Sequence, residues 1–253
     1  EIRFAAPIEA AYVLNGVEER QSEARFDGDR LIVSCGRFAP STYLVKLRPS
    51  DIRLDTPSSL PVELPCNDYA FTADAFNRQG NLDGKGNSYA AELLPERIVS
   101  EGVAFRVSGD VARRNVVKCD GQRIALPQGG YDRVYLLAAS LDGDRDAEFT
   151  VDGKPFRRTV PYYSGFFGQW GHDGEPGYVK DGDLAYVGTH RHSAERGNDP
   201  YVFTYMYKIC LPVGAGAKEL VLPEDRNVAV FAVTVSDNPN DCLSPLNEIR
   251  ALP

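Results

Sequence analysis

The sequence predicts an all-β fold composed of β-sandwiches, and two observations support this. Asp-Gly pairs, which favour the tight turns that join strands, occur seven times along the 253 residues. The runs between these turns are rich in β-branched and aromatic residues, as strands are. Only residues 88–96 and 8–14 have a composition compatible with helices, and both stretches are short.

The expected strands follow one another through most of the chain. Residues 149–154 read as a strand that enters a hairpin turn, and the odd positions of 201–211 are apolar, which predicts one face on a core. Residues 228–235 are apolar on both faces, as in a central strand. The complete set of expected strands is 30–36, 42–48, 103–107, 115–119, 133–140, 147–151, 156–164, 201–211 and 228–235.

Proline content suggests how the chain is divided. Four prolines fall within residues 49–65, and because proline cannot donate to a central sheet, this segment is expected to be a connector. Residues 1–48 hold only a few strands, so we expect them to complete a sandwich whose other strands lie elsewhere. Residues 66–236 suffice for one jelly-roll β-sandwich, and residues 237–253 form a tail.

Composition excludes several classes of protein. The formal net charge is −8 and the pI is about 5.0, which argues against a nucleic-acid partner because phosphate contacts need clustered Lys and Arg. No apolar stretch is long enough to span a membrane. The five cysteines lack the spacing of a zinc ribbon or a disulfide scaffold. The chain starts within a strand-like run, so we expect a fragment of a longer protein, and its start does not indicate a compartment.

The densest polar cluster is residues 189–195. On a strand, His190 and His192 would share one face, where two imidazoles are able to chelate a metal. With Glu195 this pattern suggests a cupin-like metal-dependent enzyme, although the cupin spacing and its second motif are missing. A hydrogen-bonded polar patch and a sugar contact are the alternatives.

Two further loops carry candidate ligands. Residues 77–87 are rich in Gly, Asn and Asp, so Asn77 and Asp83 are candidate oxygen ligands of a structural calcium, although turn formation explains these residues equally well. Residues 166–173 hold the only tryptophan, Trp170. An aromatic face beside polar groups is suited to stacking on a sugar ring, and an aromatic plug between two sheets is the alternative.

A series of motifs, in order, carries a family resemblance. The motifs are PIEAAYVLNGVEE (7–19), FAPSTYLVKL (38–47), DGKGNSYAAELLP (83–95), GVAF (102–105), NVVKCDGQRIALP (115–127), YDRVYLLAAS (131–140), GFFGQW (165–170), GYVK (177–180), THRH (189–192) and VFAVTV (230–235). Together they resemble the C-terminal β region of bacterial α-mannosidases of glycoside hydrolase family 38. The central motifs also resemble galactose-binding-like accessory modules of other glycosidases.

This resemblance implies a fold and a role. Residues 1–48 would be the terminal strands of the glycosidase β-sandwich region, and residues 66–236 would be a jelly-roll, galactose-binding-like module. The family's zinc and its catalytic residues belong to an N-terminal domain with a His-x-Asp pattern, which this chain lacks. The resemblance therefore implies a non-catalytic domain that packs on that catalytic domain and contacts a mannose-containing glycan. The candidate glycan-binding residues are Trp170, Tyr178, His190, Arg191 and His192. A free-standing carbohydrate-binding module is the alternative, beside the cupin-like enzyme.

Overall fold

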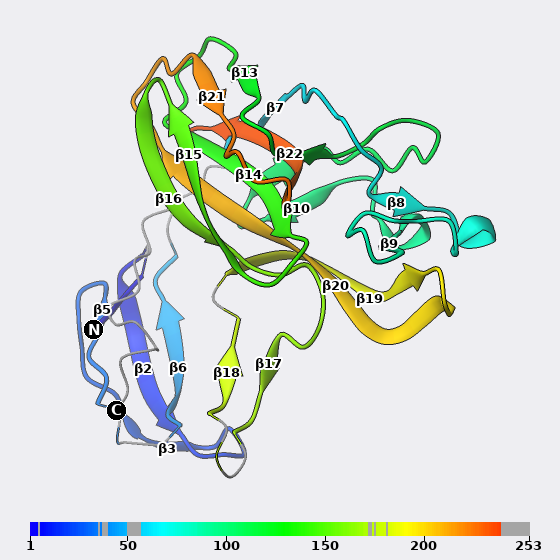
Figure 1. Cartoon of the computed structure of the whole chain (residues 1–253). Coiled ribbons are helices and arrows are strands. Elements are labelled where there is room, and N and C mark those ends of the chain that lie inside the picture. The colour runs from blue at the N-terminus through cyan, green and yellow to red at the C-terminus, as the bar shows by residue number, and fades with distance from the viewer. Residues whose placement is uncertain are drawn as a thin grey trace. The chain divides into compact units, whose positions relative to one another are not determined.

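The fold was analysed in a computed structural model, which describes residues 1–238 apart from 5, 35, 37–39, 50–56, 172, 173, 175 and 181. Strands dominate this part of the chain, and its only helices are two single-turn 3-10 helices, η1 (Asp74–Phe76) and η2 (Ala91–Leu93). No helix in the described residues has the length and apolar character needed to cross a bilayer. The predicted all-β class is confirmed (Figure 1).

The chain divides into two compact units, Glu1–Asp55 and Thr56–Pro253. The expected connector, 49–65, falls across this division, and its residues 50–56 lie outside the described part. Within the remainder, β7 (Leu60–Val62) pairs antiparallel with β22 (Val228–Ser236) in the second unit. Pro61 is tolerated there because β7 has only one partner strand, so no ladder bond is lost on its outer side. Of the expected tail, 237–253, only residues 237 and 238 are described.

The first unit consists of two antiparallel sheets. One has the order β1–β5–β4 and the other β3–β2–β6, and their small shared core contains Ile8, Ala11, Ala24 and Leu31. Residues 8–14 form the central strand β2 and not a helix, because β3 and β6 satisfy its backbone groups on both sides. The strands are β1 (Ile2–Arg3), β2 (Ile8–Leu14), β3 (Arg20–Glu23), β4 (Phe26–Asp27), β5 (Arg30–Leu31) and β6 (Thr42–Leu47).

The second unit is a β-sandwich. Its large sheet has the order β12–β22–β14–β20–β19–β9–β8, with β7 beside β22, and a four-stranded sheet has the order β13–β21–β15–β16. Two short hairpins, β10–β11 and β17–β18, complete it. The remaining bounds are β8 (Phe71–Thr72), β9 (Asn87–Ala90), β10 (Ile98–Ser100), β11 (Val103–Phe105), β12 (Val117–Lys118), β13 (Arg123–Ala125), β14 (Arg133–Ser140), β15 (Arg145–Val151), β16 (Lys154–Val160), β17 (Gly168–Gln169), β18 (Tyr178–Val179), β19 (Asp183–Ser193), β20 (Gly197–Pro212) and β21 (Glu219–Val221).

The central strand β14 separates two hydrophobic cores. Val134, Leu136 and Ala138 belong to the core shared with the four-stranded sheet. Their neighbours Tyr135 and Leu137 belong to the core on the opposite face, which also contains side chains of β9, β10 and β11. This alternation follows from the two-residue period of a strand and explains why β14 is apolar at nearly every position.

Several local predictions can be compared with the strands. The turn in 149–154 is confirmed, since Asp152 and Gly153 adopt positive φ between β15 and β16, as a tight hairpin turn requires. Residues 88–96 form β9 and then the single turn η2 rather than a continuous helix. The run 201–211 lies within β20, but both of its faces are buried from Thr204 to Ile209, and Tyr201 is exposed. Among the even positions, Met206 packs in the same hydrophobic core as Tyr205 and Tyr207.

Candidate functional site

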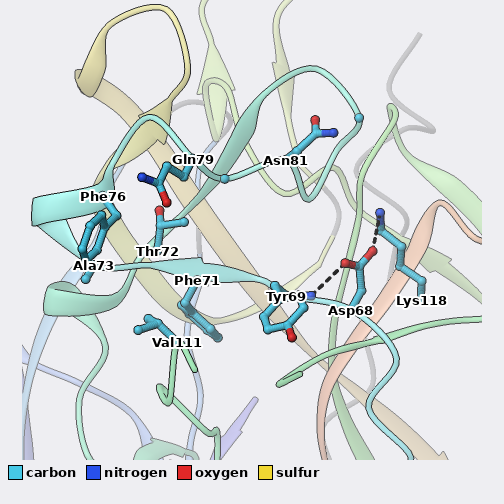
Figure 2. Close-up of a pocket in the computed structure, with 12 residues that line it drawn as sticks. Asp68, Tyr69, Phe71, Thr72, Ala73, Phe76, Gln79, Asn81, Val111 and Lys118 are labelled. Carbon is cyan, nitrogen blue, oxygen red and sulfur yellow. Dashed lines mark hydrogen bonds and ion pairs between the residues drawn. The ribbon is translucent and has the colours of Figure 1, made fainter. Parts of the chain in front are cut away.

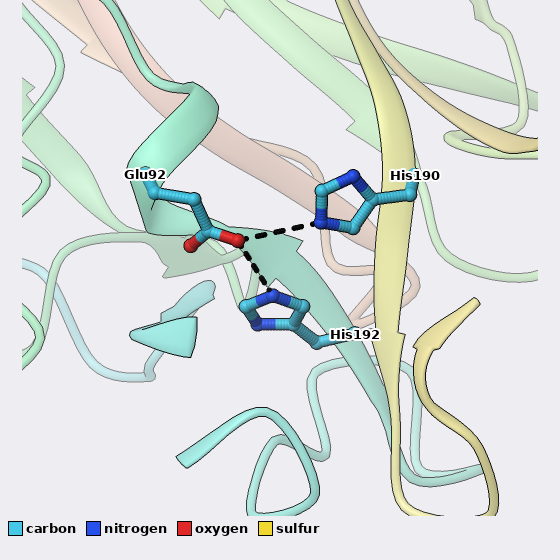
Figure 3. Close-up of side chains that lie close together, drawn as sticks. All are labelled: Glu92, His190 and His192. Carbon is cyan, nitrogen blue, oxygen red and sulfur yellow. Dashed lines mark hydrogen bonds and ion pairs between the residues drawn. The ribbon is translucent and has the colours of Figure 1, made fainter. Parts of the chain in front are cut away.

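Three side chains that offer metal-ligating atoms converge on the face of β19. The Nε2 atoms of His190 and His192 lie 3.3 Å and 2.9 Å from Oε1 of Glu92 (Figure 3). The ligating atoms of all three residues lie within 4.8 Å of one another. The side chain of His192 is fully buried, whereas those of His190 and Glu92 retain 20% and 35% of their exposure, so the cluster is open to solvent on one side.

Strand pairing explains how residues so far apart in sequence meet. His190 and His192 are two positions apart on β19, so their side chains project from the same face. β9 pairs with β19 in a register that places Ser88 opposite His192. The chain then turns directly from β9 into η2, and this turn brings the Glu92 carboxylate over both imidazoles.

Hydrogen-bonded hydroxyls contact the buried His192 ring at Nδ1, on the side away from Glu92. The Thr72 hydroxyl lies 2.8 Å from Nδ1 of His192 and 2.7 Å from the Ser88 hydroxyl. A Cβ atom added at Gly80 would lie only 2.0 Å from Ser88 Oγ, so the loop before β9 packs on these hydroxyls only because residue 80 is glycine. These contacts hold the His192 ring with Nε2 toward Glu92.

An unpaired phenol lies near the cluster. Tyr186, on the same strand, is 6% exposed, and its hydroxyl has no hydrogen-bond partner among the described residues. Burial and, secondly, the negative charge of Glu92 raise the pKa of Tyr186 to about 12, so the phenol stays protonated at neutral pH. The buried Thr204 hydroxyl is likewise unpaired in the described part of the chain. Both hydroxyls lie close to the position that a Cβ atom would take at Gly188 on β19, and both would be satisfied by a ligand or water.

A pocket opens beside Thr72, the residue whose hydroxyl is linked by hydrogen bonds to both Ser88 and His192. Its volume is about 550 Å³, within the range of small-molecule sites. Figure 2 shows its rim, where the rings of Tyr69 and Phe76 are 47% and 56% exposed. Asp68 and Lys118 form a 2.8 Å ion pair in the wall. The rest of the wall mixes polar and apolar side chains: Phe71, Thr72, Gln79, Asn81 and Val111.

The predicted glycan-binding residues fall into three places. His190 and His192 belong to the cluster with Glu92. Arg191, which alternates to the other face of β19, binds the buried carboxylate of its cross-strand partner Asp199 at 2.9 Å. Trp170 and Tyr178 belong to the β17–β18 hairpin, where Trp170 directly follows β17 and is 91% exposed. Glu195, the carboxylate expected to complete the metal site, is exposed in the turn between β19 and β20 instead.

The two predicted calcium ligands have separate protein partners. The Asn77 amide donates to Asn198 at 2.8 Å. Asp83 accepts hydrogen bonds from the backbone of Lys85, from the Asn87 amide and from the Tyr163 hydroxyl, so both of its oxygens are engaged in holding the loop. This arrangement matches the expected turn-forming role, and calcium binding stays a prediction.

Comparison with protein families identifies the family of the second unit. The model of the AziU2-like β-sandwich domain matches residues 58–239. This chain belongs to the AziU2-like β-sandwich family. The match begins after the first unit and includes every residue of the cluster and the pocket. The match supports the predicted β-sandwich and gives no evidence for glycoside hydrolase parentage. No curated protein matches the chain.

Glu92 and the pocket aromatics were not identified as site residues from the sequence, although part of the pocket wall belongs to the loop 77–87 singled out for calcium. Glu92 falls within the motif of residues 83–95, but it is 98 residues from His190, and only the pairing of β9 with β19 brings them together. The pocket aromatics Tyr69 and Phe76 belong to a short segment without periodicity. The one available signal was His190-x-His192 itself, which implied a third ligand on a neighbouring element.

Proposed function

We propose that this AziU2-like domain is a non-catalytic module that binds a glycan in the pocket beside β8 and packs on the catalytic domain of an α-mannosidase-like glycoside hydrolase. The observation that carries the proposal is the composition of that pocket. Sugar rings present apolar C–H faces together with hydroxyls, and they are bound by aromatic rings flanked by polar side chains. Tyr69 and Phe76 provide the rings, and Gln79, Asn81 and the Asp68–Lys118 pair provide hydrogen-bonding groups.

The β17–β18 hairpin is a second candidate surface for the same glycan. Trp170 is almost fully exposed, and Phe166 and Tyr178 are also solvent-accessible. Exposed large aromatic side chains on a short hairpin and just before it favour a binding role. This surface includes two of the residues predicted from the sequence, whereas the pocket includes none of them.

Calorimetric titration of the chain with mannosides and galactosides tests the proposal. Phe76→Ala removes one stacking face and should weaken binding by about 1–2 kcal/mol, or about five- to thirty-fold. Trp170→Ala tests the hairpin instead: it removes an exposed ring outside the pocket, and it should leave the affinity unchanged if the glycan binds in the pocket. If Trp170→Ala abolishes binding and Phe76→Ala does not, the site belongs to the hairpin. The absence of heat with every sugar would refute glycan binding.

The α-mannosidase parentage has a separate test. The resemblance of motifs from residue 7 to residue 235 supports it. The complete gene should then encode an upstream domain with a His-x-Asp pattern, and the isolated chain should not hydrolyse an aryl mannoside. A gene that encodes no such domain would leave the free-standing carbohydrate-binding module as the better description, and turnover by the chain alone would contradict a non-catalytic role.

A further inference from the structure

The cluster of Glu92, His190 and His192 has the composition of a transition-metal site. Two imidazole nitrogens and one carboxylate oxygen form the ligand set of many zinc centres that keep a fourth position open. Calcium and magnesium prefer sites made only of oxygen, so the two nitrogens favour zinc-like ions over them. All three ligand atoms lie within 4.8 Å of one another, before any ion draws them together.

The two distances to the Glu92 oxygen are close to those of tetrahedral coordination, and the two histidine nitrogens lie within 4.8 Å of each other. Ligands bound about 2.0–2.2 Å from a tetrahedral ion lie about 3.3–3.6 Å apart. The distance from His190 Nε2 to Glu92 Oε1 is already 3.3 Å. The distance from His192 Nε2 to the same oxygen is 2.9 Å, so that pair must separate by only a few tenths of an ångström. Glu92 is partly exposed on a single-turn helix, where its side chain has freedom to make this adjustment.

The surroundings of His192 prepare it for metal binding. Nε2 coordinates a metal through its lone pair, so the ring proton must be on Nδ1. Thr72 Oγ1 lies 2.8 Å from Nδ1 and 2.7 Å from Ser88 Oγ, so in the metal-bound tautomer it would accept the hydrogen bond of Nδ1–H and donate its own proton to Ser88. Outer-shell partners of this kind orient metal-binding histidines and fix their tautomer.

The fourth position would be accessible from solvent. The partial exposure of His190 and Glu92 leaves a path from solvent to the ligand atoms. Tyr186, whose buried hydroxyl is unpaired in the described part of the chain, lies close enough to Glu92 to sense its charge.

We propose that Glu92 Oε1, His190 Nε2 and His192 Nε2 bind one zinc-class divalent ion per chain, with water in the fourth position. The three ligand residues lie outside the glycan pocket, and a chain that binds no glycan would still bind the ion. Without the ion, Glu92 accepts a hydrogen bond from Nε2–H of each histidine, and on binding the two ring protons move to Nδ1. The competing explanation is that the cluster is only this hydrogen-bonded network.

Titration of the chelator-treated chain with Zn²⁺, in the absence of sugar, tests the proposal. Wild type should bind one Zn²⁺ per chain and melt at a higher temperature with the ion than without it. Glu92→Gln keeps a hydrogen-bond acceptor but loses the carboxylate charge, and it should abolish stoichiometric binding, as should His190→Gln. Glu195→Gln is the matched control, because it makes the same chemical change in the neighbouring turn and should bind like wild type.

Two additional measurements separate metal binding from a structural role. Thr72→Val should weaken Zn²⁺ binding by about 10- to 100-fold, as the loss of an outer-shell partner does. Co²⁺ should produce the strong visible absorption of a four-coordinate site in wild type and in Glu195→Gln, but not in Glu92→Gln. Circular dichroism with chelator present should show that all the variants are folded.

The outcomes decide between the two explanations. Saturable binding that is lost with Glu92 and His190 but retained without Glu195 supports the metal site. The absence of saturable binding by wild type would overturn it and leave a hydrogen-bonded network. Equal binding by wild type, Glu92→Gln and His190→Gln would also overturn it, since the ion would then be held elsewhere.

Discussion

Lys208 is a buried lysine whose ion pairs should contribute measurably to the stability of the β-sandwich. Its side chain on β20 is 2% exposed, and its ammonium binds Glu101 and, at 3.0 Å, Asp183. Both carboxylates are about half-exposed or more. Removing the lysine therefore leaves two carboxylates that water can hydrate, whereas removing the carboxylates leaves a buried ammonium without its counter-ions. The two perturbations should have very different costs.

The size of this difference follows from the geometry. Lys208→Met keeps an apolar chain beside Tyr135 and should destabilise the protein by about 1–2 kcal/mol through lost charged hydrogen bonds. The combined Glu101→Ala and Asp183→Ala variant should lose about 3–5 kcal/mol. Its upper limit is the cost of deprotonating a lysine with an ordinary pKa of about 10.5, which is about 4.8 kcal/mol at pH 7 and about 2 kcal/mol at pH 9.

Urea unfolding followed by circular dichroism at pH 7 and pH 9 measures both costs. The carboxylate variant should recover much of its loss at pH 9, and Lys208→Met should not. Burial alone would lower the pKa of Lys208, but its hydrogen bonds to Glu101 and Asp183 raise the pKa above 10.5 overall. The stabilisation in wild type is therefore complete below about pH 10.5 and is lost as pH rises through the raised pKa. Equal costs for the two variants, or a cost that does not change between pH 7 and pH 9, would refute this reasoning.

Three further predictions concern packing and reactivity. Leu136→Ala, in the core between the two sheets, should destabilise the protein by about 2–5 kcal/mol in urea unfolding, and a loss under 1 kcal/mol would contradict the packing described. Gly188→Ala should cost about 1–3 kcal/mol in the same assay, because its Cβ would lie 2.4 Å from Thr204 Oγ1; unchanged stability would show that β19 shifts freely. Burial raises the pKa of both Cys119 and Cys66, but only Cys119 is fully buried, so iodoacetamide should modify Cys119 only after unfolding and the partly exposed Cys66 slowly in the folded protein, as peptide mapping would reveal.

The fold class could be predicted from the sequence because its signals are local. Asp152–Gly153 forms a tight turn for steric reasons that two residues contain in full. β14 and β22 are apolar at almost every position because both of their faces are buried, and that property is visible in each strand alone. Strands without such a signal were missed or shortened. β19 is the clearest case, since its polar residues bind partners on other strands rather than water.

The candidate site could be predicted only in part, because it depends on a non-local register. His190 and His192 share a face by strand periodicity alone, and the structure places them together. Their third partner is determined by the pairing of β9 with β19, and the nearby Glu195 is excluded because it follows β19 in a turn. Residues 88–96 have a helical composition, but the open edge of β19 provides backbone partners for β9 that a short helix would not have.

Thr72 connects the two proposals. Its hydroxyl lies on Nδ1 of His192, and the same residue lines the pocket together with Gly80, which packs against Ser88. An ion bound by His192 would fix the direction of the Thr72 hydrogen bond and so restrict one wall of the pocket. Coupling of this kind is reciprocal, so any factor by which Zn²⁺ changes glycan affinity must equal the factor by which the glycan changes Zn²⁺ affinity. Because Thr72→Val removes the connecting hydroxyl, it should bring that factor to one even where both ligands still bind.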